Sequence, residues 1–453
     1  MFEELKPLMK LAGPVILAEV GWMSMGLVDT VMVGPLGPAA IAATGMGSGV
    51  FTAIVIFGMG LMLGLDAYVS QAHGAGDERE CLLWLHQGVW LACCVAPIAM
   101  ALTWILYGTL DYWGLHPETR RLVGPYIRAI SFSALPILVY AAFRRYLQGM
   151  HLVRPIMVAL VSANIINAAA NWVLIYGNLG MPALGVEGSA WATTIARVYM
   201  AAFLYLAIRG VHRRRGHRHP KVDLAFDPVR IKRLIGLGAP AASQVGLEVG
   251  VFAVATALAG RLDPVSSGAH QIALNLASLA FMVPLGLASS AAVRVGYAFG
   301  AGDRPRAARA GWTALATGCV VMTALGLIFF LWPVPLLRVF SPDPRIIEIG
   351  VSLLAIAAAF QLFDGTQAVV TGALRGISET RMPMIVNFIG HWFLGLPVGY
   401  VLCFRFGWGV RGLWIGLSIG LILAALVLTV VWWKRTLLLV RQDAKGNVIH
   451  AER

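Results

Sequence analysis

Long apolar stretches recur along this chain, and they constrain its fold more than any other feature. Between residues 11 and 433 we count twelve stretches that could cross the hydrocarbon of a bilayer, which takes about 20 residues in a helix. Only 13% of the 453 residues are charged, whereas soluble proteins average about 25%. A soluble fold is therefore excluded, and the 58% apolar content excludes a disordered chain. The sequence predicts a polytopic helical membrane protein.

The excess of positive charge gives the orientation of these stretches. The chain has 35 Lys and Arg residues against 22 Asp and Glu, a net charge of +13 that would also suit a nucleic-acid-binding protein. Most of the basic residues, however, fall in loops on the same side as the N-terminus, and Lys and Arg are enriched in the cytoplasmic loops of membrane proteins. We therefore expect both termini in the cytoplasm and no nucleic-acid partner.

The two halves of the sequence repeat each other. Gly74-Ala75-Gly76-Asp77 recurs as Gly300-Ala301-Gly302-Asp303, 226 residues later, and Pro14 and Pro240 share this offset. Six predicted spans separate equivalent positions, and because six is even, both halves enter the membrane in the same orientation. This arrangement predicts a pseudo-twofold axis along the membrane normal, as in transporters built from parallel repeats.

These observations predict a fold and a domain division. The fold is an all-α integral membrane protein with twelve transmembrane helices in two six-helix lobes, related by the pseudo-twofold axis. The predicted parts are an N-terminal lobe (1–210), a basic cytoplasmic linker (211–233), a C-terminal lobe (234–433) and a cytoplasmic tail (434–453).

Three carboxylates inside predicted spans are candidates for function. A charge at mid-bilayer costs about 2.5–3.5 kcal/mol, so uncompensated charges should be rare. Asp29, Glu248 and Asp364 lie in the first, seventh and tenth spans. The equivalent positions of the other half carry no acid; they hold Ala255, Trp22 and Ile137. Because the scaffold does not require acids there, we predict functional roles, with a structural, hydrogen-bonded acid as the alternative.

Polar side chains accompany these acids in both halves. Except for Thr193, which reaches a similar depth from the sixth span, the members of each set recur at helical spacing and so share one face or stripe of a span. Such side chains could coordinate a cation or polarise a carboxylate, or they could simply connect packed helices. The members are Asn164, Asn167, Asn171 and Thr193 near Asp29, and Gln361, Gln367 and Thr371 near Asp364.

Three further charged residues in or beside predicted spans give weaker signals. Glu19 lies about 80° around its helix from Asp29, so we do not expect these two acids to form one site. Asp66 precedes a cytoplasmic turn, which favours a role as a cap or turn anchor. For Arg197, inside the sixth span, we expect a structural ion pair.

Motifs of catalysis and of nucleotide hydrolysis do not occur in the sequence. It has no GxxxxGK[ST], HExxH or GxSxG, so an ATP-driven pump or a recognisable hydrolase is not supported. The five cysteines form no CxxC and lie mostly in apolar stretches, which favours buried side chains over metal or redox sites. We expect no enzyme and no cofactor.

Four segments resemble a known family. They are Met25–Gly34, Val69–Gly76, Gly268–Asn275 with its continuation through Val283-Pro284-Leu285, and Thr371–Gly376. Together they make the chain resemble the multidrug and toxic compound extrusion (MATE) transporters, and within them the NorM-like bacterial branch, over roughly residues 5–435. The resemblance implies two six-helix lobes around a central cavity and export of organic cations, dyes or drugs in exchange for Na+ or H+.

The resemblance also implies functional residues. By motif, the functional acids of the family fall on Asp29, Glu248 and Asp364, where Na+ would bind. Its N-lobe cation site falls on Asn167 and Asn171. The full predicted cation-coupling set consists of these five residues and Thr193. The predicted substrate-binding set consists of the three acids with Gln271, Gln361 and Gln367.

The predicted function is a cation-coupled antiporter that exports organic cations, drugs or toxic metabolites across the bacterial cytoplasmic (inner) membrane by alternating access. The coupling ion is Na+ or H+. The alternatives are a lipid-linked oligosaccharide flippase of the same superfamily or another polytopic secondary transporter. A membrane-embedded enzyme lacks a visible catalytic constellation, and a passive channel lacks a filter motif. The expected partners are the lipid bilayer and small organic, cationic substrates, and we expect a monomer.

Overall fold

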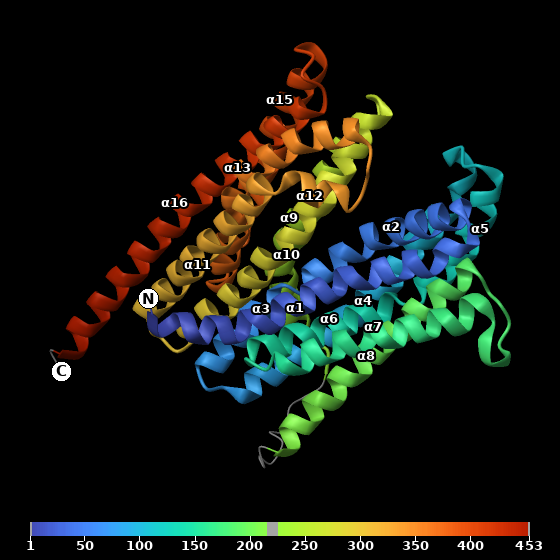
Figure 1. Cartoon of the computed structure of the whole chain (residues 1–453). Helices are drawn as coiled ribbons and strands as arrows, with labels where there is room; N and C mark the ends of the chain where they lie inside the picture. Colours follow the sequence, from blue (N-terminus) through green and yellow to red (C-terminus); the bar gives the residue numbers. More distant parts are fainter. Residues whose placement is uncertain (1, 215–224, 452–453) are drawn as a thin grey trace. The chain divides into compact units, whose positions relative to one another are not determined.

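The computed structural model describes residues 2–214 and 225–451 (Figure 1). In this part of the chain, helices are joined by short turns and there is no strand. The α-helices before the gap are α1 (Phe2–Val33), α2 (Pro38–Leu61), α3 (Gly64–Gly74), α4 (Glu78–Gly108), α5 (Pro117–Ser131), α6 (Ala134–Gly149), α7 (Arg154–Tyr176) and α8 (Val186–Arg214). Short 3-10 helices are η1 (Gly34–Leu36), η2 (Leu110–Trp113) and η3 (Asn178–Gly180). Residues 215–224 of the predicted linker and 452–453 of the predicted tail lie outside the described residues.

After the gap the described chain is again α-helical, and it contains two π-helical segments near the C-terminus. The α-helices are α9 (Pro228–Ala259), α10 (Pro264–Gly300), α11 (Arg304–Leu331), α12 (Pro333–Arg338), α13 (Pro344–Gly376), α14 (Arg381–Phe388), α15 (Leu396–Tyr400) and α16 (Gly409–Ala451). The π-helical segments η4 (Ile389–Gly395) and η5 (Val401–Arg405) follow α14 and α15, so that Arg381–Arg405 forms one continuous span.

The helices have the length and composition of membrane spans. Eleven helices of the described residues are long and apolar enough to cross a bilayer, and the bent pair α5 and α6 makes a twelfth. The predicted all-α membrane fold is confirmed. The fourth predicted span is bent, however, because α5 and α6 meet at 46°. Pro136 explains the break: proline is tolerated in the first turn of α6, but in a continuous helix its ring would displace the carbonyl of Phe132.

The chain divides into two compact units whose boundaries cut through two helices. The N-unit is Leu17–Ala242, and the C-unit combines Met1–Ile16 with Ser243–Arg453. The first half of α1 therefore belongs to the C-unit, and the first half of α9 belongs to the N-unit. The predicted lobes, residues 1–210 and 234–433, follow the sequence instead and do not divide α1 or the membrane-spanning part of α9 between units.

Local geometry repeats between the units. After α3 and α10, Gly76 and Gly302 adopt left-handed φ values of 75° and 80°. The next residues, Asp77 and Asp303, each cap the following helix: a carboxylate oxygen accepts a hydrogen bond at 2.8 Å from the backbone N–H three residues later. The repeated Gly-Ala-Gly-Asp sequence is therefore a repeated turn and helix start.

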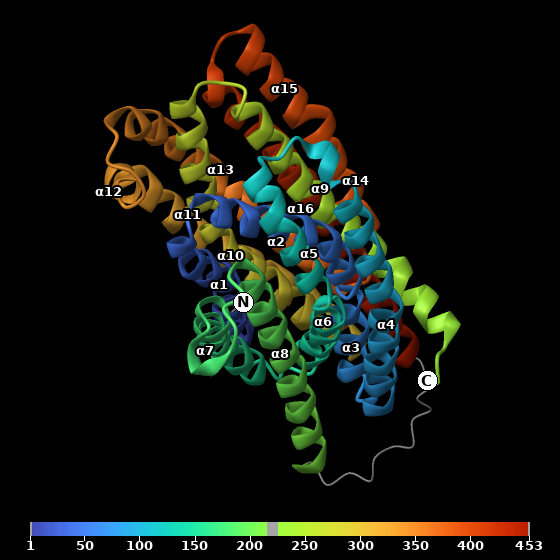
Figure 2. The same ribbon diagram turned by 90° about the vertical axis from the view of Figure 1, so that its right-hand side faces the viewer.

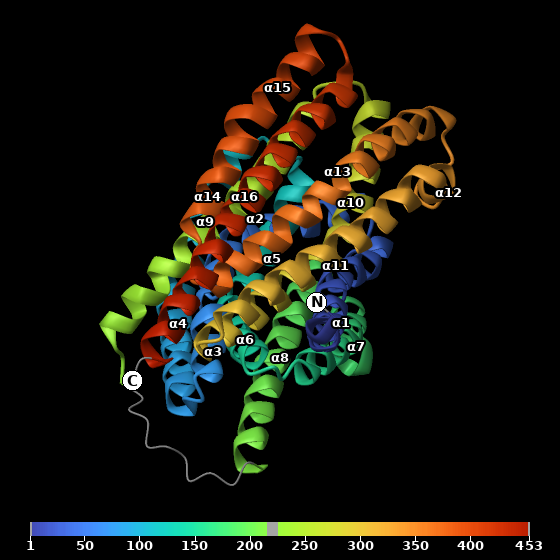
Figure 3. The same ribbon diagram turned by 90° about the vertical axis from the view of Figure 1, so that its left-hand side faces the viewer.

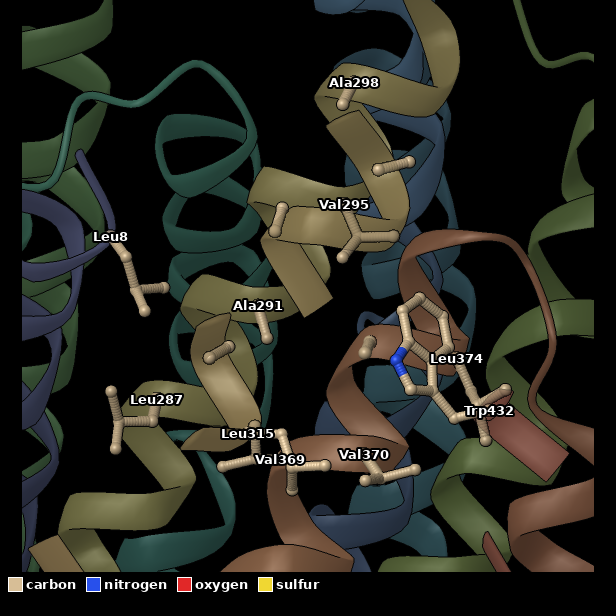
Figure 4. Close-up of a cluster of buried hydrophobic side chains, with 14 of the residues drawn as sticks. Leu8, Leu287, Ala291, Val295, Ala298, Leu315, Val369, Val370, Leu374 and Trp432 are labelled. Carbon is tan, nitrogen blue, oxygen red and sulfur yellow. The ribbon is translucent and has the colours of Figure 1, made fainter. Parts of the chain in front are cut away.

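The core of the C-unit shows why the start of α1 belongs there. Buried side chains of α10, α11, α13 and α16 form one apolar cluster, which includes Leu287, Val369 and Trp432 (Figure 4). Leu8 of α1 belongs to the same cluster and is 1% exposed. In water, burial of a leucine side chain stabilises the folded protein by about 1.5–3 kcal/mol. Within a membrane, van der Waals packing between the helices provides the stabilisation instead.

A seam of glycines joins α16 to the preceding span. Gly412, Gly416 and Gly420 lie four residues apart on α16. A Cβ on Gly416 would lie 2.1 Å from the backbone nitrogen of Gly399, and a Cβ on Gly420 would lie 2.1 Å from the carbonyl oxygen of Gly390. Only glycine permits this approach, so the two backbones are in direct contact.

The π-helical turn keeps the facing glycines in register. On the preceding span, the seam glycines are Gly390, Gly395 and Gly399, spaced five and then four residues apart. The wider interval lies within the π-helical η4, which holds one extra residue per turn. Pro397 accounts for the widening, because in an α-helix its ring would clash with the carbonyl of Phe393.

Candidate functional site

The polar side chains predicted around Asp29 meet in the N-unit. Asn167 and Asn171 each donate an Nδ2 hydrogen bond to Oδ1 of Asp29, at 3.0 and 2.7 Å, and Thr193 Oγ1 donates to Oδ2 at 2.7 Å. Asn171 also donates to Oδ1 of Asn167 at 3.2 Å. None of the four side chains is more exposed than Asp29, at 6%. The carboxylate is therefore held by three neutral donors away from solvent.

Helix geometry brings these residues together. Asn167 and Asn171 are four residues apart and share one face of α7. α7 and α8 lie side by side (Figure 2) and come into backbone contact at Gly188, where a Cβ would lie 2.5 Å from the Leu174 carbonyl oxygen. Thr193 follows less than two turns along α8, so the close approach places its hydroxyl next to the asparagine face.

Two neighbours of this cluster make other contacts. Asn164 donates to two backbone carbonyls at 3.0 and 2.9 Å, so it connects packed helices. For Arg197 the expected ion pair is wrong: among the residues that the structure describes, no carboxylate lies within ion-pair distance. Its Nη1 donates to Ser133 Oγ at 2.5 Å, and its guanidinium lies 5.0 Å from the centroid of the Phe51 ring. A hydroxyl and an aromatic face contact this buried cation, and the negative charge of Asp29 acts on it from beyond ion-pair distance.

Both predicted carboxylates of the second half lie in the C-unit. Asp364 on α13 is 8% exposed, and Glu248 on α9 is half-buried. The two are close enough for their negative charges to repel each other. Over residues 2–214 and 225–451, neither carboxylate has a hydrogen-bonding side chain or a cation beside it. Two carboxylates that repel each other with no cation beside them are costly within a membrane.

The predicted amides near Asp364 face different helices. Gln367 Nε2 donates to Asn387 Oδ1 on α14 at 2.5 Å. Gln361 packs on α11: a Cβ added to Gly326 of α11 would lie 3.6 Å from the Cβ of Gln361. Both polar atoms of Gln361 and Oε1 of Gln367 are buried without a partner in the described part of the chain. These atoms lie within one turn of Asp364 along α13.

Gln271 does not join this group. It is exposed on α10, and within the described ranges it has no hydrogen bond to the acids or amides above. Its buried neighbour His270 accepts a hydrogen bond from Trp414 Nε1 at 3.0 Å, while His270 Nε2 lies 3.0 Å from Thr256 Oγ1. An indole N–H can only donate, so the neutral imidazole carries its proton on Nε2. The motif around Gln271 thus contributes a buried polar link between α9, α10 and α16.

Two ion pairs of the N-unit were not predicted. Glu19 accepts a hydrogen bond from Arg144 of α6, and these residues are 6% and 4% exposed. Asp66, in the first turn of α3, pairs with Arg145 at 3.3 Å. Glu19 is therefore held apart from Asp29, and Asp66 anchors a turn. The available signal was the Arg144-Arg145 dipeptide, which lies inside an apolar stretch rather than in a loop.

The carboxylates that are at most 8% exposed, together with the half-buried Glu248, fall into two classes. Those with an arginine partner are Glu4, Glu19 and Asp66. Those without an ion pair in the part of the chain described are Asp29, Glu248 and Asp364. A carboxylate kept at low exposure without a cation is costly, which points to function rather than packing. The second class consists of the three acids that the sequence singled out.

Two units of membrane-length helices that hold carboxylates without ion-pair partners are typical of a membrane transporter. The chain belongs to the MatE family: the family model MatE matches residues 14–173 and 240–401. The two matched segments begin at Pro14 and Pro240, which are equivalent positions of the repeat.

Relatives and a solved structure agree with this assignment. The "Probable multidrug resistance protein NorM" of Mesorhizobium japonicum is 36% identical over 440 residues, which cover 96% of this chain and 94% of that protein. The "Multidrug resistance protein PmpM" of Pseudomonas aeruginosa is 35% identical over 441 residues, covering 94% and 91%. The crystal structure of the eukaryotic MATE transporter AtDTX14 has the same fold, with a TM-score of 0.85 at 21% identity over 97% of this chain and 99% of that one. The resemblance to the NorM-like branch of the MATE transporters is confirmed.

Proposed function

We propose that this protein is a cation-coupled antiporter that exports small organic cations, drugs or toxic metabolites across the bacterial cytoplasmic membrane. The relatives named multidrug resistance proteins support export of drugs. The single observation that supports coupling to an inward cation is the set of membrane carboxylates without an ion pair, Asp29, Glu248 and Asp364. An arginine partner would neutralise such a carboxylate. Without one, each of the three acids can bind a proton or a monovalent cation.

The Asp29 cluster is proposed as one coupling site. Its three hydrogen-bond donors are neutral, so the carboxylate keeps its charge available for an incoming cation. Asn171 Oδ1 is buried without a partner in the described residues, and Thr193 and Asn167 add further oxygens. Hard oxygen ligands of this kind suit Na+, whereas the carboxylate alone suits H+. No group of three or more His, Cys, Asp and Glu side chains that could hold a metal ion occurs in residues 2–214 and 225–451, so a Na+ site here would rely on amide and hydroxyl oxygens.

The Glu248 and Asp364 pair is proposed as a second site, with Gln361 and Gln367 as polar contacts for a substrate. A carboxylate that holds either the coupling ion or a cationic substrate links the two fluxes, because occupation by one displaces the other. Alternating access by rocking of two lobes would then expose the loaded carboxylates to each side in turn. In this proposal both termini are cytoplasmic, as the Lys and Arg distribution favours, and the transporter acts as a monomer.

The test is ethidium efflux from proteoliposomes under a Na+ gradient or a pH gradient, each imposed separately. Asp29→Asn, Glu248→Gln and Asp364→Asn should each lower efflux at least tenfold. A matched control neutralises another buried acid together with its partner, as Glu19→Gln/Arg144→Met, and should retain efflux. Full activity of both Asp29→Asn and Asp364→Asn would refute the coupling role, and efflux independent of either gradient would refute antiport.

A further inference from the structure

The first halves of α1 and α9 make equivalent contacts in different units. The last residues of these halves, Ile16 in the C-unit and Ala242 in the N-unit, are 226 residues apart, which is the offset of the repeat. Each packs against a glycine: a Cβ on Gly286 would lie 3.0 Å from Ile16 Cα, and a Cβ on Gly60 would lie 2.5 Å from Ala242 Cα. Gly60 and Gly286 are themselves 226 residues apart, so both segments dock against their unit in the same way.

In the C-unit, Glu4 fixes the start of α1. Its carboxylate accepts hydrogen bonds from Arg294 of α10 and from Arg306 Nε of α11, the latter at 2.8 Å. The side chains of Glu4 and Arg294 are each 9% exposed. The start of α1 lies beside α11 (Figure 3), and Leu8, one turn further along, enters the apolar cluster (Figure 4). We call Glu4, Arg294 and Arg306 the C-clasp.

In the N-unit, Arg230 fixes the start of α9. Its Nη1 donates to Glu80 Oε1 of α4, and its Nε lies 3.1 Å from Asp227 Oδ2. Its guanidinium also lies 5.4 Å from the centroid of the Trp84 ring. The Arg230 side chain is 24% exposed, so this cluster is more open to solvent than the C-clasp. We call Arg230, Glu80 and Asp227 the N-clasp.

One contact of each clasp, Glu4 with Arg306 and Arg230 with Glu80, occupies equivalent positions with inverted charge. Arg230 is 226 residues after Glu4, and Arg306 is 226 residues after Glu80. The C-clasp is a carboxylate between two guanidiniums, and the N-clasp is a guanidinium between two carboxylates. If the two half-helices exchanged places, Glu4 would face Glu80 and Arg230 would face Arg306. Like charges at these contacts oppose the exchange, whereas the glycine contacts are alike in both units and cannot distinguish the segments.

We propose that the two clasps assign each half-helix to its unit and hold it docked there, and that opening a clasp releases its half-helix. The release step rests on the proposed function, because alternating access requires the cytoplasmic ends of helices to move. Pro14 and Pro240 lie two residues before the unit boundaries within α1 and α9. Each lacks a backbone N–H donor, so the helix can bend there when the segment before it leaves its unit.

The test measures how fast a buried position of each half-helix becomes accessible. Leu8 and Leu234 are equivalent positions, 1% and 0% exposed. In a chain whose five native cysteines are replaced by serine, the thiols of Leu8→Cys and Leu234→Cys are labelled with a maleimide in proteoliposomes. Glu4→Gln should raise the labelling rate at position 8 at least fivefold and leave position 234 unchanged. Arg230→Gln should do the converse, with a smaller increase because the N-clasp is already partly exposed.

Matched controls remove one positive charge from the same helices outside the clasps. Arg309→Gln on α11 and Lys232→Gln on α9 change exposed residues and should alter neither rate. A charge-reversal series tests polarity: Glu80→Arg should raise labelling at position 234, and Glu80→Arg/Arg230→Glu should remove at least half of that increase. Equal increases at both positions for either neutralisation, no increase, or no recovery in the double variant would refute the clasps.

The release step has its own measurement. During gradient-driven ethidium efflux, labelling at positions 8 and 234 should rise above the rate in the resting protein. Unchanged labelling during active efflux would refute release while leaving antiport standing. If antiport itself fails in the efflux test, the clasp-specific labelling differences still decide whether the clasps hold the half-helices.

Discussion

Replacing Arg144 with methionine will destabilise the protein far more than replacing Arg144 and Glu19 together. The two side chains, 4% and 6% exposed, form an ion pair between α6 and α1. Arg144→Met leaves a carboxylate buried without its cation, and breaking a buried pair in this way costs about 3–5 kcal/mol. In Glu19→Gln/Arg144→Met no charge is left, and replacing a buried pair by neutral groups of similar size is often neutral. A difference of about 3 kcal/mol corresponds to more than a hundredfold in the folding equilibrium.

The assay is unfolding of the purified protein by SDS titration, with ethidium efflux measured on the same variants. The double variant should keep both its free energy of unfolding and its efflux, because Glu19 is not assigned to transport. Arg309→Met, which changes an exposed arginine on α11, should alter neither quantity. If the double variant were as unstable as Arg144→Met, or if it folded but lost efflux, then Glu19 would not be a structural acid and the two-class sorting of carboxylates would be wrong.

Three further predictions follow from single contacts. Thr193→Val should lower ethidium efflux several-fold, because it removes the 2.7 Å hydrogen bond to the coupling carboxylate. Thr194→Val should not, because Thr194 donates only to backbone carbonyls, at 2.9 Å in its own helix and at 3.4 Å to Ala129, and equal losses would contradict the site. Gly416→Ala should lower the free energy of unfolding by about 1–3 kcal/mol, since its Cβ would lie 2.1 Å from a backbone nitrogen across the seam, and Gly45→Ala, which meets nothing within 4 Å, should be tolerated. Asp303→Ala should cost about 0.5–2 kcal/mol in the same SDS titration through loss of its N-cap bond, and an unchanged value would show that the cap contributes nothing.

The sequence was sufficient where a site depends on helix periodicity and depth. Asn167 and Asn171 share a face because they are four residues apart, and Thr193 reaches the same depth from the next helix, so their convergence on Asp29 could be predicted. The repeat also served as an internal control, because it showed that Asp364 has no acidic counterpart in the first half.

Contacts that depend on which helices become neighbours could not be predicted in this way. Periodicity gives the face of a residue but not the partner helix. The pairing of Arg144 with Glu19 could therefore not be predicted, and the ion pair expected for Arg197 is wrong. The exchange of the first halves of α1 and α9 was missed for the same reason. An apolar stretch stays apolar across Ile16, where its packing partners change.

The inverted clasps have a consequence for how a duplicated chain of this kind can be divided. Two copies of the first half, paired with each other, would set Glu4 of each copy against Glu80 of the other, and two copies of the second half would set Arg230 against Arg306. Identical halves would therefore repel at both docking points, whereas unlike halves attract at both. The two halves of the sequence are therefore complementary rather than interchangeable. Each compact unit includes a half-helix that the other half of the sequence supplies.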